Sequence, residues 1–93
     1  MIARDARPRL AAKARLRRDR VNGGWLLLYP ERGLSLNATG ADVVGLCTGE
    51  HTVGAIIDTL TARYSAASPG VIEREVLAFL GALADRGLVA CTS

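Results

Sequence analysis

The chain has 93 residues, of which 49% are hydrophobic and 23% charged, and its formal net charge is +3. This length and hydrophobic fraction predict one globular domain and exclude an intrinsically disordered chain. The longest uninterrupted apolar run, Trp25 to Tyr29, is too short to span a bilayer, and the N-terminus lacks the apolar stretch of a secretory signal. We therefore expect a cytoplasmic protein with no membrane partner.

The positive charge is concentrated at the N-terminus. Residues 1–20 carry a net charge of +6, whereas residues 21–93 carry a net charge of −3. Residues 1–12 show no strong hydrophobic period and contain Pro8, so we predict a flexible basic arm there. Such an arm can attract nucleic acid, an acidic peptide or an acidic protein surface. The folded domain is predicted over residues 13–90, with a short tail at 91–93.

A β-hairpin is predicted next in the chain. The segment from Ala14 to Val21 alternates in part, and Asn22-Gly23 favours a tight turn because both turn positions require positive φ. The return strand is Trp25–Tyr29, which Pro30 ends because proline supplies no N–H to a ladder. Residues 33–36 alternate as a short third strand, which becomes a candidate sheet edge because the helices begin directly after it.

Three helices are predicted after the strands. Their N-caps are Asn37, Thr52 and Ser68, the last followed by proline at the first helical position. Gly49 and Gly87 are expected to end the first and third helices. Leu88-Val89 is expected to add an extended tail. The order βββααα predicts an α+β, winged-helix-like fold, with a three-stranded antiparallel sheet packed on the helices.

The third helix is apolar over about half its circumference. One line of apolar residues contains Ile72, Val76, Phe79 and Leu83, and an adjacent line contains Leu77, Leu80 and Ala84. One line is expected to face the core and the other an open groove. The sequence does not say which, and the alternative that all of them are ordinary core residues stays open.

Catalytic and metal chemistry have no support in the sequence. Cys47 and Cys91 form no CxxC pair, and His51 has no cysteine at ligand spacing. We interpret Cys47 as a small buried residue, Cys91 as a near-terminal thiol and His51 as a turn residue. There is also no phosphate-binding glycine loop and no nucleophile–His–acid set. The prediction is therefore a protein that is not an enzyme, with no cofactor and no metal.

Three segments resemble one known family in order and spacing. They are RLRRDRV at 15–21, WLLLYPERGLSLNATGADVVGLCTGEHTVGAIIDTL at 25–60 and VIEREVLAFLGALADRGLV at 71–89. Together they resemble the PqqD proteins of pyrroloquinoline quinone biosynthesis, over roughly Arg9 to Val89. The resemblance implies a peptide chaperone of the RiPP recognition element type with no catalytic role.

The resemblance also implies two partners and a binding site. A PqqA-like precursor peptide would add as an extra strand beside the third strand and lie against the third helix. A PqqE-like radical S-adenosylmethionine enzyme would then receive it. The implied peptide contacts are Gly33, Leu34, Ser35 and Leu36 of the strand and both lines of the third helix: Ile72, Val76, Leu77, Phe79, Leu80, Leu83 and Ala84.

The arginines of the first strand have two interpretations. Arg15, Arg17, Arg18 and Arg20 either steer an acidic peptide or dock the enzyme, or they are solvated charges that protect an exposed strand. Both interpretations stay open. So does the oligomeric state, monomer or homodimer, since a free strand edge permits strand exchange.

Two other functions are alternatives to peptide capture in this pathway. A recognition domain of another peptide-modifying pathway, of the mycofactocin type, has the same local motifs. A winged-helix nucleic-acid binder is disfavoured, since residues 71–89 carry a net charge of −1 and a helix that meets phosphates is expected to be basic. We therefore expect no nucleic-acid partner.

Overall fold

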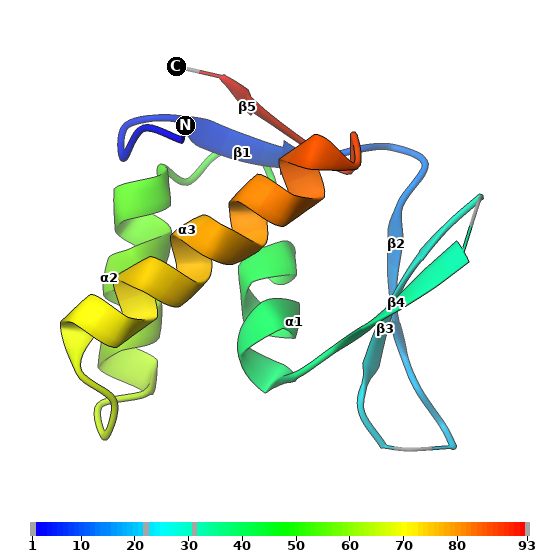
Figure 1. The fold of residues 1–93 in the computed structure, drawn as a ribbon, viewed down its shortest axis with the longest axis horizontal. Helices are drawn as coiled ribbons and strands as arrows, with labels where there is room; N and C mark the ends of the chain where they lie inside the picture. The colour runs from blue at the N-terminus through cyan, green and yellow to red at the C-terminus, as the bar shows by residue number, and fades with distance from the viewer. Residues whose placement is uncertain (1, 22, 31, 93) are drawn as a thin grey trace.

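The computed structural model describes residues 2–21, 23–30 and 32–92. These residues contain five strands and three helices (Figure 1). In chain order the elements are β1 (Arg7–Leu10), β2 (Arg15–Arg18), β3 (Trp25–Tyr29), β4 (Arg32–Leu36), α1 (Ala38–Gly45), α2 (Val53–Arg63), α3 (Pro69–Asp85) and β5 (Val89–Thr92). The predicted α+β arrangement, a three-stranded antiparallel sheet followed by three helices, is confirmed. The structure adds the outer strands β1 and β5.

The main sheet has the strand order β2-β3-β4, and both pairs are antiparallel. Leu16 of β2, Leu27 of β3 and Leu34 of β4 lie opposite one another, so they share the inner face of the sheet. Leu27 is completely buried on this face. Figure 1 shows the helices on one side of this sheet, with α1 nearest to it. The apolar run of β3 thus supplies the centre of the sheet's contribution to the core.

The β2–β3 connection is longer than a two-residue turn. Arg18 lies opposite Trp25, so residues 19–24 form the loop. Asp19 N–H donates to Gly24 O over 2.8 Å, and Gly23 has a φ of 72°. The predicted hairpin is confirmed, and Gly23 has the positive φ that the sequence indicated. The other predicted turn residue, Asn22, lies outside the described residues.

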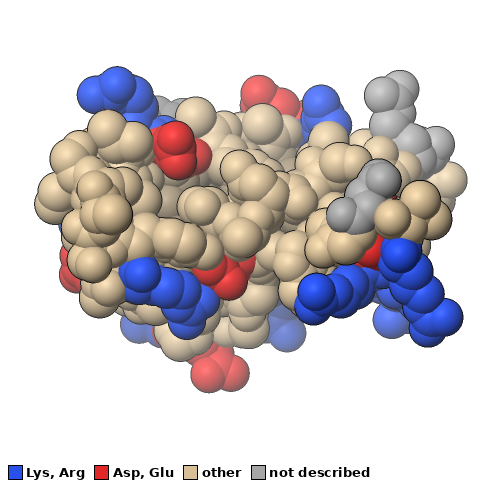
Figure 2. Space-filling model, turned by 90° about the horizontal axis from the view of Figure 1, so that it is seen from below, with Lys and Arg blue, Asp and Glu red and all other residues tan. Residues whose placement is uncertain are grey.

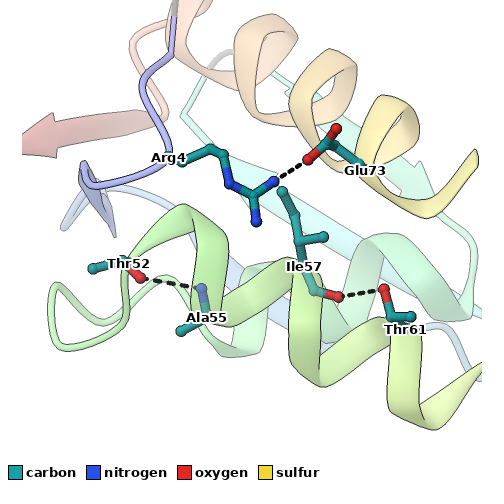
Figure 3. A network of polar contacts seen from close by, with 6 residues as sticks. All are labelled: Arg4, Thr52, Ala55, Ile57, Thr61 and Glu73. Carbon is teal, nitrogen blue, oxygen red and sulfur yellow. Dashed lines mark hydrogen bonds and ion pairs between the residues drawn. The ribbon is translucent and has the colours of Figure 1, made fainter. Parts of the chain in front are cut away.

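Each helix begins at its predicted cap. The side-chain oxygens of Asn37, Thr52 and Ser68 accept hydrogen bonds from the backbone N–H three residues further on (Figure 3 shows the bond from Ala55 to Thr52). The end of α3 is also as predicted: Gly87 has a φ of 70°, and the Leu88 N–H donates to Leu83 O. Helix α1 ends at Gly45 rather than at the expected Gly49, which lies in the following turn.

The N-terminal segment differs from the predicted flexible arm. Residues 7–10 form β1, which pairs antiparallel with β5 in a separate sheet, and Pro8 is completely buried. Of the expected tail, residues 91 and 92 belong to β5, whereas Ser93 lies outside the described residues. The two strands are about eighty residues apart in sequence and four residues long, so no local period marks their pairing. The fold therefore includes strands near both ends of the described chain.

A second set of contacts holds the N-terminal segment across the helices. The carbonyl oxygens of Arg4 and Ala6 accept hydrogen bonds from Gly54 and Val53 at the start of α2, over 2.9 and 2.8 Å. The Arg4 guanidinium pairs with Glu73 of α3, as Figure 3 shows. The first N–H groups of a helix have no carbonyl partner within the helix. At the start of α2 the N-terminal segment supplies the carbonyl acceptors for the N–H groups of Val53 and Gly54.

The core lies between the three helices and the two sheets. Its members include the apolar stripe of α2 (Val53, Ile56, Ile57 and Leu60), the inner residues of α3, Leu88 with Val89, and residues of α1 and the main sheet such as Val43, Val44 and Leu27. Cys47 is buried in this core, as predicted, whereas Cys91 is exposed. Within the described residues, no helix has both the length and the hydropathy needed to cross a membrane.

Candidate peptide-binding site

Strand β4 forms one edge of the main sheet. Among the described residues it pairs only with β3, so its other side carries no strand. Leu36 is buried, Leu34 is half-buried, and Gly33 and Ser35 are exposed. An edge strand with this exposure can accept a further extended segment through main-chain hydrogen bonds. This is the geometry that strand addition requires.

A pocket lies where β4 runs into α1. Its volume is about 250 Å³, and its walls come from the start of α1 and the middle of α3. The lining residues are Asn37, Thr39, Gly40, Val43, Glu75, Val76, Ala78 and Phe79. The volume is below the roughly 300–1,000 Å³ typical of small-molecule sites, so the pocket suits a side chain better than a cofactor.

Gly40 lies where the first turn of α1 meets α3. Gly40 is buried, and its N–H donates to the Asn37 side-chain oxygen over 2.8 Å. A Cβ at this position would lie 3.4 Å from Phe79 Cζ, near ordinary van der Waals contact, and more tightly, 3.2 Å, from the Asn37 oxygen. The Phe79 ring therefore packs closely against the first turn of α1 at Gly40. That ring forms one wall of the pocket.

A polar cluster joins α1 to the end of α2. The Tyr64 hydroxyl donates to one carboxylate oxygen of Asp42, and Arg63 Nη1 lies 3.1 Å from the other. The hydrogen bond with Asp42 raises the pKa of Tyr64 above its ordinary value. The end of α2 is thereby tied to α1, so the pocket wall formed by Thr39 and Val43 sits on an anchored helix.

The two lines predicted on α3 are not separated by the structure. The buried residues are Ile72, Val76, Leu80 and Leu83, so the core face takes members of both lines. Phe79 is half-buried and turned to the pocket. The expectation that one whole line faces the core and the other a groove was therefore wrong, because the helix is rotated between the two alternatives.

The remaining predicted contacts of α3 lie away from the pocket. Leu77 is half-buried and stands one turn after Glu73, the residue that pairs with Arg4 on the side of α2 (Figure 3). Ala84 is exposed and does not line the pocket. Of the predicted contacts on α3, Val76 and Phe79 are pocket residues. Contact of a peptide with the others stays a prediction.

Sequence reasoning missed most of the pocket. The pocket residues that it did not assign to a binding site are Asn37, Thr39, Gly40, Val43, Glu75 and Ala78. One signal was present: a glycine in the first turn of a helix costs helix stability, and a close packing contact is a common reason for it. The contact partner, Phe79, is 39 positions away, which no local pattern reveals.

The four arginines of β2 and its loop have different surroundings. The Arg18 guanidinium lies over the Trp25 ring, 5.5 Å from its centroid, so this charge is stacked on an aromatic face. Arg15, Arg17 and Arg20 are exposed. Among the described residues these three have no hydrogen-bond or ion-pair partner.

The described part of the chain contains no candidate metal-binding site. No group of three or more His, Cys, Asp or Glu residues there could hold a metal ion. His51 is exposed in a bend before α2.

Comparison with known proteins shows which family the chain belongs to. Residues 24–89 match the family described as coenzyme PQQ synthesis protein D (PqqD). The chain belongs to the PqqD family. Its resemblance to this family at the level of sequence motifs is thereby confirmed, and the matched stretch includes β3, β4 and all three helices.

Individual PqqD relatives are similar over most of the chain. A protein of Rhodopseudomonas palustris (strain TIE-1), named PqqA binding protein, is 39% identical over 88 residues, which are 95% of this chain and 85% of that protein. The bifunctional coenzyme PQQ synthesis protein C/D of Methylorubrum extorquens is 38% identical over 79 residues, or 85% of this chain but 21% of that protein. In that relative the similar region is one part of a longer chain.

A solved PqqD structure has the same fold. The solution NMR structure of the PqqD truncation of Methylobacterium extorquens PqqCD matches with a TM-score of 0.81 and 34% identity. The match covers 97% of this chain and 95% of that one. That structure is described as a functional, stand-alone recognition element for ribosomally synthesized and post-translationally modified peptides. The winged-helix-like architecture is therefore the fold of the family.

Proposed function

We propose that this PqqD-family chain is a peptide chaperone of pyrroloquinoline quinone biosynthesis. It binds a PqqA-like precursor peptide as an additional strand on β4 and presents it to a PqqE-like radical S-adenosylmethionine enzyme. The observation that carries the proposal is the edge of β4, which among the described residues pairs only with β3 and is followed directly by Asn37, a residue of the pocket between α1 and α3. The names of the relatives support this pathway over a mycofactocin-type one.

Backbone pairing alone does not account for stable binding. Four ladder hydrogen bonds at about 1 kcal/mol each contribute roughly 4 kcal/mol. Association costs an estimated 4–15 kcal/mol, so apolar anchors must supply the difference. Each fully buried anchor contributes about 1.5–3 kcal/mol. The pocket offers a place for one such anchor at the end of the paired strand, against the Phe79 ring.

The test is to fill the pocket and measure peptide binding. Ala78 is exposed and lines the pocket, so Ala78→Trp places an indole in it without disturbing the buried core. We expect the affinity for a synthetic PqqA-like peptide of the same organism, measured by calorimetry, to fall by at least about tenfold, equivalent to losing one anchor.

The matched control is Ala62→Trp. Ala62 is also an exposed helical alanine, but it lies on α2, does not line the pocket and is not a predicted peptide contact, so this variant should bind the peptide as the unchanged chain does. Equal affinities for all three proteins would contradict the role of the pocket. No measurable peptide binding by the unchanged chain would contradict the proposed function as a whole.

A further inference from the structure

The main sheet has a second face that none of the described helices covers (Figure 1). In β2, β3 and β4, residues directly opposite one another lie on the same face. Arg15 lies opposite Leu28, which lies opposite Gly33, and Arg17 lies opposite Leu26, which lies opposite Ser35. These six residues form what we call the outer face, because Leu27 and Leu36 are buried on the other side with α1: Arg15, Arg17, Leu26, Leu28, Gly33 and Ser35.

The centre of the outer face is apolar. Leu28 is 38% exposed, and Leu26 is half-buried. A Cβ on Gly33 would lie 3.1 Å from Leu28 Cδ2, so the leucine side chain reaches across to β4 at the place where that strand has no side chain. The two leucines thus form an apolar patch that extends over β3 and toward the edge strand. An exposed apolar patch bordered by polar residues is typical of an interaction site.

One border of the outer face is positively charged. Arg15 and Arg17 are exposed, and neither has a hydrogen-bond or ion-pair partner among the described residues. Strands β2, β3 and β4 contain no Asp or Glu. Figure 2 shows several Lys and Arg side chains gathered at the end of the molecule that this sheet forms. A complementary surface would therefore be acidic around an apolar centre.

We propose that the outer face is the docking surface for an acidic protein surface, on the enzyme that receives the peptide. This inference rests on the proposed function, and it places the partner beside the captured strand rather than on it. The outer face includes one face of β4 at Gly33 and Ser35, whereas the peptide would pair with the backbone N–H and C=O groups along the edge of that strand. A protein bound to the outer face therefore reaches the peptide without occupying the backbone edge or the pocket.

Two other occupants fit the outer face less well. A nucleic acid would place phosphates against Leu26 and Leu28, which offer no hydrogen-bond donor. A second copy of this chain paired through β2 would bring Arg15 and Arg17 close to their own counterparts, and like charges placed opposite each other destabilise a strand pair. An acidic protein with an apolar centre satisfies both parts of the surface.

The test compares two charge reversals of equal size. Arg17→Glu changes the outer face, whereas Arg86→Glu changes an exposed arginine at the end of α3. The measured quantity is the affinity of the full chain for the purified PqqE-like enzyme of the same organism, by biolayer interferometry. We expect Arg17→Glu to weaken it by at least about tenfold and Arg86→Glu to leave it nearly unchanged.

A second pair of variants tests the apolar centre. Leu28→Ser removes the leucine from the outer face, and Val71→Ser removes an apolar side chain of similar exposure, 40%, from the start of α3. We expect Leu28→Ser to weaken enzyme binding and Val71→Ser to have no such effect. Affinity for the precursor peptide should be the same in all four variants, which also reports that they are folded.

Three results would overturn the inference. They are equal enzyme binding by Arg17→Glu and Arg86→Glu, a parallel loss of peptide binding in Arg17→Glu, and a change in the chain's own oligomeric mass in that variant without a loss of enzyme binding. The last two would assign the outer face to the peptide or to a homodimer. Failure of the unchanged chain to bind any peptide would overturn the proposed function instead, and the enzyme-binding comparison would still decide the role of the outer face.

Discussion

At the scale of single residues, the thiol of Cys47 shows most directly how burial changes chemistry. Its side chain lies in the core at the end of α1 and is 4% exposed. Burial, with a smaller contribution from nearby Cys91, raises the pKa of Cys47 from 9.0 to about 12. The thiolate form is the nucleophile, so Cys47 should be inert in the folded chain, whereas the exposed Cys91 is available to reagents.

The raised pKa of Cys47 predicts a loss of stability at high pH. Below pH 9.0 the thiol is protonated in both states, whereas between 9.0 and about 12 the unfolded chain releases a proton that the folded chain keeps. The free energy of unfolding should therefore fall as the pH rises through this window, by up to about 1.4 kcal/mol per pH unit from this group.

Denaturant titrations of the unchanged chain and of Cys47→Ala, compared from pH 8 to pH 11, measure this contribution. The difference between the two should be constant below about pH 9 and should shrink above it. A difference that stays constant over the whole range would contradict the burial of the thiol. A constant offset from the smaller side chain does not affect the comparison.

At the scale of elements, the N-terminal segment is structural rather than a free arm. Ala6 is buried in the core, its carbonyl oxygen accepts the Val53 N–H, and β1 follows it. Ala6→Asp would bury an unpaired carboxylate, and we expect it to lower the free energy of unfolding by about 3 kcal/mol or more, measured by urea denaturation.

The control for this variant is Ala12→Asp, which places the same side chain at an exposed position between β1 and β2. Its effect should be within about 0.5 kcal/mol. If both variants were equally stable, residues 1–12 would behave as the flexible arm that their sequence pattern indicates.

Local sequence could predict those helix starts and ends that depend on contacts between residues a few positions apart. Asn37, Thr52 and Ser68 start helices through hydrogen bonds to residues three positions away, and Gly87 ends α3 through its own positive φ. Strands β1 and β5 depend on pairing between the two ends of the chain, which a single sequence does not show. The same limit applies to α3: its apolar residues could be predicted, but its rotation is set by packing.

The candidate site was predicted in part for the same reason. The free edge of β4 follows from strand order, because the chain passes directly from that strand into helices. The pocket required knowledge that Gly40 and Phe79 meet, and the outer face required the register that puts Arg17 opposite Leu26. Both depend on contacts between elements rather than on the pattern within one.

At the scale of the whole molecule, the proposed function and the inference above assign two separate binding surfaces to one small sheet. The edge of β4 continues into the pocket between α1 and α3, whereas the outer face points away from the helices. The helices cover only the inner face, and the β1–β5 sheet lies apart from the main one. A carrier that must hold a peptide and meet an enzyme at once needs this separation.

The most direct measurement is an amide chemical-shift titration of the full chain with the synthetic PqqA-like precursor peptide. The account predicts that the largest shifts occur in Gly33–Leu36 and around the pocket, at Gly40 and at Phe79, with smaller changes on β2. Shifts confined to residues 4–20, with β4 and the pocket unaffected, would contradict it and would indicate attraction of the peptide to the basic N-terminal region alone.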